Sequence, residues 1–374
     1  MRTFKLNTFA LLTLLVSFSF IKDDSTTHKQ EPFEDFRSLD GSTIKAHELD
    51  TFLQAQMESL SIPGISFSFV NDGNIVYQSS LGVVNTETMG LVTSQTLFDA
   101  ASISKTVFSF FTLQMVDKGM IDLDTPLYTY LLNPDIAHDE RYKKITARMA
   151  LSHTTGFPNW RYLTNKGYDP NAKLRIEFEP GTQYQYSGEG FKYLSQVLAH
   201  LLKTDLDGLQ TIINKELFMA LEMGESSFVW NNYLEKNRAD GHLNGQPNPG
   251  YSSSSKNPNF NAAASLQTNA SAYGNFLVAL MSGKLLSENT HQQMLSIQAE
   301  RQATDRRAGV KYGLGVIINP TQEGTNYAHS GDNESATSQF YFNDKFKSGY
   351  VYFINAEFKI KDQFDKNLQA FLLD

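Results

Sequence analysis

The residue types and spacing best suited to chemistry in this sequence are Ser102 and Lys105, three positions apart. A serine hydroxyl becomes an effective nucleophile when a neighbouring group accepts its proton, and an amine can do so. Residues three apart on a helix lie on one face, which would bring the lysine amine next to the hydroxyl. The pair therefore indicates nucleophilic catalysis. The alternative is a serine at a helix start followed by a solvated lysine.

The sequence around the pair carries more information than its spacing. The same Ser-x-x-Lys spacing recurs three times, at Ser19/Lys22, Ser42/Lys45 and Ser253/Lys256. Only Ser102 is followed by a wide apolar face at helical spacing, and Lys118 and Gly119 then give a stop signal. This pattern predicts a buried helix that begins at Ser102.

A tyrosine stands at a second suggestive position. Tyr186 precedes Ser187 and Gly188 immediately before an amphipathic helix pattern. Helix starts favour Ser, Asp or Asn, so a tyrosine on a glycine-flanked turn could point at a ligand. The alternative is a core aromatic with a satisfied hydroxyl.

Two histidines also lie in distinctive contexts. His329, Ser330 and Gly331 stand where an edge strand is expected to begin, and a glycine there permits close backbone approach. An idle histidine is the alternative. His153, in "LSHTTGFPNW", is assigned to hydrogen bonding within its loop rather than to catalysis.

Several other chemistries lack support in the sequence. The eight histidines show no His-x-x-x-His or His-Glu-x-x-His spacing, and there are no cysteines. Asp122 and Asp124 lack the Gly and distal Glu of a calcium loop. A net charge of -8 without a long Lys/Arg run argues against a nucleic-acid partner. We therefore expect no metal and no nucleic acid.

The N-terminal residues have the plan of a signal peptide. Arg2 and Lys5 precede an apolar stretch from Thr8 to Ile21, which is short for a membrane span. We expect export to the periplasm or the medium by residues 1–21, with membrane contact only if this leader stays uncleaved as an anchor.

Helix and strand patterns place these residues in a larger plan. A helical pattern over 47–60 precedes a hairpin signal at Asn71-Asp72-Gly73. Helical patterns follow at 148–151, 191–202, 209–221 and 272–281, whereas the strand patterns "YGLGVIIN", "SQFYFND" and "SGYVYFINA" come near the end, before a closing helix over 361–373. We expect an α+β fold whose sheet joins both ends of the chain, with a helical lobe inserted between them.

Ser-Ile-Ser-Lys, Tyr-Ser-Gly and His-Ser-Gly together resemble, in order and approximate separation, the three motifs of penicillin-recognising serine hydrolases. The likeness is to the branch of class C β-lactamases, D-Ala-D-Ala carboxypeptidases and family VIII carboxylesterases. It runs from about Leu49 to about Glu357 and includes "ALSHTTGFP", "FEPGTQYQYSGEGF" and "YGLGV". The resemblance implies a β-lactamase/transpeptidase-like fold, with an antiparallel sheet flanked by helices.

The resemblance also implies roles for individual residues. Ser102 would be the acylated nucleophile, and Lys105 and Tyr186 would share its proton. The backbone N–H groups of Ser102 and Asp332 would form the oxyanion hole. The substrate would be bound by His329, Ser330, Gly331 and Gly188. No cofactor is implied.

Two departures from the family pattern bear on the substrate. Gly188 stands where β-lactamases of this branch usually carry an Asn, and His329 stands where they usually carry a Lys. These departures favour an esterase or peptidase that acts on small esters or D-amino-acid amides and peptides. The first alternative is a class C-like β-lactamase, and the second is a non-hydrolytic penicillin-binding or structural protein. His329 would offer a carboxylate a cation only below a pKa near 6.5.

The expected domain plan has three parts. Residues 1–21 form the leader, 22–45 a polar linker and 46–374 the hydrolase domain. Within this domain, an α/β lobe spans about 46–115 and 305–374, and a helical lobe spans about 116–304.

Overall fold

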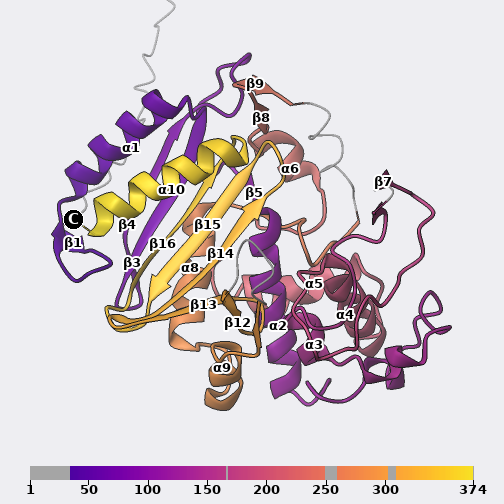
Figure 1. Cartoon of the computed structure of the whole chain (residues 1–374). Coiled ribbons are helices and arrows are strands. Elements are labelled where there is room, and N and C mark those ends of the chain that lie inside the picture. Colours follow the sequence, from indigo (N-terminus) through magenta and orange to yellow (C-terminus); the bar gives the residue numbers. More distant parts are fainter. Residues whose placement is uncertain (1–33, 166, 249–258, 302–308, 374) are drawn as a thin grey trace, which may run out of the picture. The chain divides into compact units, whose positions relative to one another are not determined.

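An antiparallel sheet of eight strands forms the framework of the described chain (Figure 1). The computed structural model describes residues 34–165, 167–248, 259–301 and 309–373, so the predicted leader lies outside the described residues. Across the sheet the order is β11 (Ala299–Glu300), β12 (Lys311–Tyr312), β13 (Ile317–Thr321), β14 (Gly324–Asp332), β15 (Thr337–Asn343), β16 (Ser348–Ile354), β3 (Gly64–Asn71) and β4 (Asn74–Gly82).

The sheet joins the two ends of the domain, as the sequence predicts. Strand β3 pairs with β16, so that Phe69 lies opposite Tyr350. Strands β3 and β4 form the predicted hairpin, in which Asp72 and Gly73 have φ values of +46° and +80°. Positive φ at both central residues defines a type I′ turn, whose twist matches that of the flanking strands.

Helices cover both faces of the sheet, so its central strands are buried on both sides. Helices α1 (Ala46–Leu60) and α10 (Phe358–Leu373) pack on one face, where Tyr350 and Tyr352 of β16 join their core. On the other face, Val351 and Phe353 join a larger core with α2 (Ser104–Asp117) and α8 (Ala270–Ser282). Successive side chains of a strand point to opposite faces, which explains why β16 is buried along its whole length.

The segment between β4 and β11 is mainly helical. Its helices and helical turns are η1 (Ala101–Ile103), α2 (Ser104–Asp117), η2 (Leu127–Thr129), η3 (Glu140–Lys144), α3 (Ala147–Leu151), α4 (Gly188–Leu201), α5 (Gly208–Ile213), the π-turn η4 (Asn214–Phe218), α6 (Asn232–Asn237), α8 (Ala270–Ser282) and α9 (Glu288–Met294). Its short strand pairs are β5 (Phe98–Asp99) with β10 (Gln267–Thr268), β6 (Leu163–Thr164) with β7 (Gly167–Tyr168), and β8 (His242–Leu243) with β9 (Gln246–Pro247). The helical segment thus lies between the strands in sequence, as expected.

The structure differs from the predicted elements in two places. The continuous strand expected for "YGLGVIIN" is interrupted at Gly313–Val316, because Gly315 has a φ of +86° and packs against Ser109. The second half of the expected linker is folded. In it, β1 (Phe36–Arg37) pairs with β2 (Thr43–Ile44) and both strands join the core under α1.

In the part of the chain that the structure describes, no helix combines the length and the apolar character needed to cross a bilayer.

Candidate active site

Ser102 lies in a tight turn rather than on the first residue of the predicted helix. It occupies the centre of η1, and α2 begins two residues later at Ser104. Ala101 before it has a φ of +47°, a value uncommon for a residue other than glycine. Ser102 is half-buried, so its hydroxyl remains within reach of a small molecule.

Lys105 directs a buried amine at the Ser102 hydroxyl. Its Nζ lies 3.3 Å from Ser102 Oγ and donates a second hydrogen bond of 2.8 Å to the carbonyl of Ala263. Lys105 is only 1% exposed, and this burial lowers the pKa of its ammonium to about 7. A neutral amine, which can accept a proton, is therefore well populated near neutral pH.

Tyr186 completes the predicted trio. The Lys105 amine lies 4.6 Å from the centroid of the Tyr186 ring, and Tyr186 is half-buried at the start of α4. The structure therefore brings Ser102, Lys105 and Tyr186 together, although the spacing along the chain is 84 residues from first to last.

His153 holds the segment that carries Tyr186. Its carbonyl accepts a 2.8 Å hydrogen bond from the N–H of Gln185, and its Nδ1 accepts one of 3.0 Å from the N–H of Ser187. Its ring lies 4.3 Å from the Tyr186 ring, centroid to centroid. His153 thus fixes the backbone on both sides of Tyr186. The sequence predicted hydrogen bonding for His153 but gave no sign of these partners, which lie 32 and 34 residues further along.

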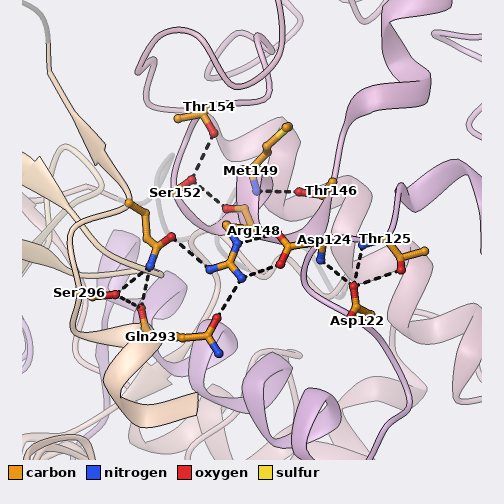
Figure 2. A network of polar contacts seen from close by, with 11 residues as sticks. Asp122, Asp124, Thr125, Thr146, Arg148, Met149, Ser152, Thr154, Gln293 and Ser296 are labelled. Carbon is orange, nitrogen blue, oxygen red and sulfur yellow. Dashed lines mark hydrogen bonds and ion pairs between the residues drawn. The ribbon is translucent and has the colours of Figure 1, made fainter. Parts of the chain in front are cut away.

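A polar network anchors the helix that leads to His153. Arg148 of α3 donates from two nitrogens to Asp124, at 2.6 and 2.7 Å, and also donates to Gln293. Figure 2 shows these contacts. At the end of the same helix, the Ser152 hydroxyl donates to the Arg148 carbonyl and lies 3.2 Å from Thr154 Oγ1. A two-point Arg–carboxylate contact fixes orientation as well as distance. The network therefore fastens the base of the His153 loop.

His329 is placed next to the trio but is not the exposed cation that its position suggested. It is 3% exposed, and its ring lies 6.2 Å from that of Tyr186. Burial and, secondly, the nearby Lys105 charge lower the pKa of His329 to about 3. The expectation that His329 becomes charged below about pH 6.5 is therefore wrong, because the ring is enclosed rather than solvated.

The hydrogen bonds of His329 define its neutral form. Nδ1 lies 2.9 Å from the Ser330 carbonyl, which can only accept, so Nδ1 carries the proton. Nε2 lies 2.8 Å from the Tyr312 hydroxyl and then accepts from it. Both ring nitrogens are thus satisfied within the protein.

The other predicted residues of β14 lie along a partly open strand edge. Pairing of β14 with β13 stops at Ala328, whereas pairing with β15 continues to Asp332. Among the described strands, the segment from His329 to Asp332 therefore has a partner on one side only. Alternation along the strand places His329 and Gly331 on one face and Ser330 on the other, so the His329 and Ser330 side chains do not line the same face.

Gly188 lies beneath the ring of Trp160, a residue that the sequence did not single out. A Cβ added to Gly188 would come within 2.5 Å of Trp160 Cη2. Arg161, next in the chain, holds this segment to α4 through Glu189, with contacts of 3.0 and 2.7 Å to one carboxylate oxygen. Any side chain at position 188, including Asn, would require Trp160 to move.

Among the described residues, no three His, Asp or Glu side chains gather as metal ligands would.

Burial should keep both site histidines neutral. We expect the imidazole NMR signals of His153 and His329 to keep the chemical shifts of a neutral ring between pH 8 and 5.5, because burial also lowers the pKa of His153 well below its usual value. Titration of the nearby Lys105 should change them only slightly. The same histidines in urea-unfolded protein should titrate near 6.5. Unfolding then takes up protons below that pH, so stability should fall as the pH decreases. Folded-state signals that move to the chemical shifts of a protonated ring, with a midpoint above pH 5.5, would contradict the burial argument.

Most of the chain is similar to known proteins. The Beta-lactamase family model matches residues 49–374. Esterase EstB of Burkholderia gladioli is 25% identical over 173 residues, which are 40% of this chain and 44% of that protein. Penicillin-binding protein 4 of Amycolatopsis lactamdurans is 25% identical over 190 residues, or 49% of each chain. The matches thus span about half the length of these relatives.

A solved structure supports the same fold over a larger part of the chain. The penicillin-binding protein homologue from Pyrococcus abyssi superposes with a TM-score of 0.70 at 20% identity, covering 84% of this chain and 74% of that one. The family model covers well over half of the sequence. The chain therefore belongs to the Beta-lactamase family, and its antiparallel sheet flanked by helices is the β-lactamase/transpeptidase-like fold.

Proposed function

We propose that this protein is a serine hydrolase that cleaves small esters, or D-amino-acid amides and peptides, through an acyl-enzyme. The observation that carries the proposal is the buried amine of Lys105, 3.3 Å from the half-buried Ser102 hydroxyl. An amine with a pKa of about 7 is suited to accept the hydroxyl proton near neutral pH.

The proposed reaction has two halves. Ser102 Oγ attacks the substrate carbonyl carbon while its proton passes to Lys105, and the carbonyl oxygen becomes an oxyanion bound by the N–H groups of Ser102 and Asp332. Collapse of this intermediate breaks the bond to the alcohol or amine, which takes a proton relayed through Tyr186 and Lys105. Water then attacks the acyl-enzyme, releases the acid and restores Ser102.

Two features favour neutral esters over β-lactams as substrates. The neutral, enclosed His329 offers no cation for the carboxylate that a β-lactam carries. In addition, Trp160 occupies the space above Gly188 where β-lactamases of this branch usually hold the substrate amide with an Asn. The name of the esterase relative from Burkholderia gladioli is consistent with an ester substrate.

The nucleophile can be tested directly. We expect Ser102→Ala to abolish turnover of a chromogenic ester and to leave the melting temperature nearly unchanged, because it removes one oxygen from a half-buried side chain. Intact mass after mixing the native protein with the ester and with a labelled penicillin separates the possible functions. Ester turnover supports the proposal. Rapid loss of the penicillin would indicate a β-lactamase, and a persistent penicillin adduct without turnover would indicate a non-hydrolytic binder. Near-normal ester turnover by Ser102→Ala would refute the assignment.

The role of Lys105 predicts a pH profile. Below pH 7 the buried amine is protonated and cannot accept the Ser102 proton, so acylation should slow as the pH falls through about 7. The measurement is kcat/KM for a neutral ester between pH 5 and 9. Lys105→Arg, whose side chain stays protonated, should remain slow throughout. A flat native profile would show that Lys105 is not the base.

We also propose that residues 1–21 export the protein, because Arg2 and Lys5 precede the apolar stretch that ends at Ile21. Expression in a bacterial host should yield periplasmic or secreted protein whose mass lacks the leader. Full-length protein in the membrane fraction would instead indicate an uncleaved anchor, and full-length protein in the cytoplasm would refute export.

A further inference from the structure

A buried carboxylate lies three residues before Ser102. Asp99 ends the short strand β5, and its side chain is 1% exposed. Burying a carboxylate is costly unless hydrogen bonds and an opposite charge compensate. The partners of Asp99 therefore indicate what the carboxylate does for the fold.

Two hydrogen bonds connect Asp99 to the two sides of the candidate oxyanion hole. Its Oδ1 accepts one of 2.8 Å from the N–H of Ala101, which immediately precedes Ser102. The same oxygen accepts one of 2.9 Å from Nδ2 of Asn333, which immediately follows Asp332. One carboxylate oxygen thus joins two segments that are 232 residues apart in the sequence.

Arg238 balances the charge of Asp99. Its NH2 lies 3.5 Å from Asp99 Oδ2, and the arginine side chain is 3% exposed. A second nitrogen, Nε, donates a 2.7 Å hydrogen bond to Gln267 of β10, the strand that pairs with β5. An uncompensated carboxylate near a developing oxyanion would oppose its formation, and this pairing removes the net charge.

The two segments are also in direct backbone contact. The Ser338 hydroxyl donates a 2.7 Å hydrogen bond to the Ala100 carbonyl, and a Cβ on Gly331 would come within 2.3 Å of the same oxygen. Packing thus sets how closely the segments approach. The Asn333–Asp99 bond adds a polar tie beyond Asp332, at the end of the strand.

We propose that Asp99 is a positioning residue, which ties the turn of Ser102 to the turn after Asp332 and so sets the spacing of the two N–H groups that bind the oxyanion. The inference rests on the proposed function. In this role Asp99 acts through the backbone of the two turns and not on the substrate. Two donors held at fixed positions stabilise the transition state more than donors that must reorganise.

The most direct test is Asn333→Ala. The change removes the tie but leaves the backbone hydrogen bonds of the turn, from Asn333 N to Ala336 O and from Ser335 N to Asn333 O. We expect kcat/KM for a neutral ester to fall about 10-fold, a fraction of the 10²–10³-fold cost of losing a whole oxyanion donor. The melting temperature should change little, because Asn333 is only half-buried.

Two binding measurements distinguish positioning from general destabilisation. A boronic acid adds to Ser102 Oγ and forms a tetrahedral anion with one oxygen in the oxyanion hole, so its inhibition constant should rise by a similar factor. The dissociation constant of the intact ester, measured with Ser102→Ala as background, should stay unchanged when Asn333→Ala is added. If Asn333 only stabilised the fold, Asn333→Ala would not raise the inhibition constant of the boronic acid while leaving the dissociation constant of the ester unchanged.

Asn343→Ala is the matched control. Asn343 is the last residue of β15, at the end far from Asn333, and is 3% exposed; its Nδ2 donates to Glu323 O and Asn326 Oδ1 at 3.0 and 2.7 Å. It should lower the melting temperature without changing kcat/KM per folded molecule or boronic acid affinity.

A paired variant tests Asp99 itself without leaving a buried charge unpaired. Asp99→Asn with Arg238→Gln keeps an acceptor oxygen for Ala101 and Asn333, so kcat/KM should stay within about 3-fold of native. Asp99→Ala with Arg238→Gln removes the acceptor and should match the loss seen with Asn333→Ala. If Asn333→Ala binds the boronic acid as tightly as the native protein does, the inference about Asp99 is overturned and the proposed function is not. Native protein that neither hydrolyses esters nor binds boronic acid at Ser102 would overturn the proposed function and the inference with it.

Discussion

The contact between the Ser102 turn and β14 is the constraint on which the site depends. Gly331 lies against the Ala100 carbonyl, and a Cβ at this position would come within 2.3 Å of both that oxygen and Ser338 Oγ. Any larger residue would push the strand away from the turn, because neither backbone can yield by rotating a side chain. The close approach of the Ser102 turn to the edge of β14 therefore depends on Gly331, which has no side chain.

Burial of basic groups determines the electrostatics of the same site. Lys105, His153 and His329 are all enclosed, and burial is the main reason why the pKa of each lies below its usual value. A proton on Lys105 further disfavours one on either histidine. These three groups can be buried close together because the histidines remain neutral and only Lys105 changes charge near neutral pH. This division of roles leaves one buried base next to Ser102.

Residues from several parts of the fold hold Tyr186, a loop residue, in a fixed position. His153 binds the backbone on either side of Tyr186, and the Arg148 network fastens the helix that ends just before His153 (Figure 2). On the other side, Trp160 covers Gly188 and Arg161 binds Glu189. Side chains whose own positions are fixed by partners hold reactive groups more accurately than loops alone. Tyr186 is therefore supported by residues that have no place in the chemistry.

The sequence alone determined the features that depend on near neighbours. The hairpin at Asp72 and Gly73, the helix after Ser102 and the order of the three motifs follow from local turn chemistry, from periodicity and from residue types. Only the tertiary structure decided which side chains are enclosed. His329 is neutral because its ring is buried and, secondly, because the Lys105 charge is close. Lys105 and Tyr312, whose hydroxyl bonds to Nε2 of His329, lie 224 and 17 positions away in the sequence. Asp99, His153 and Trp160 likewise gain their places from partners that are distant in sequence, and burial depends on all such contacts together, which no local pattern records.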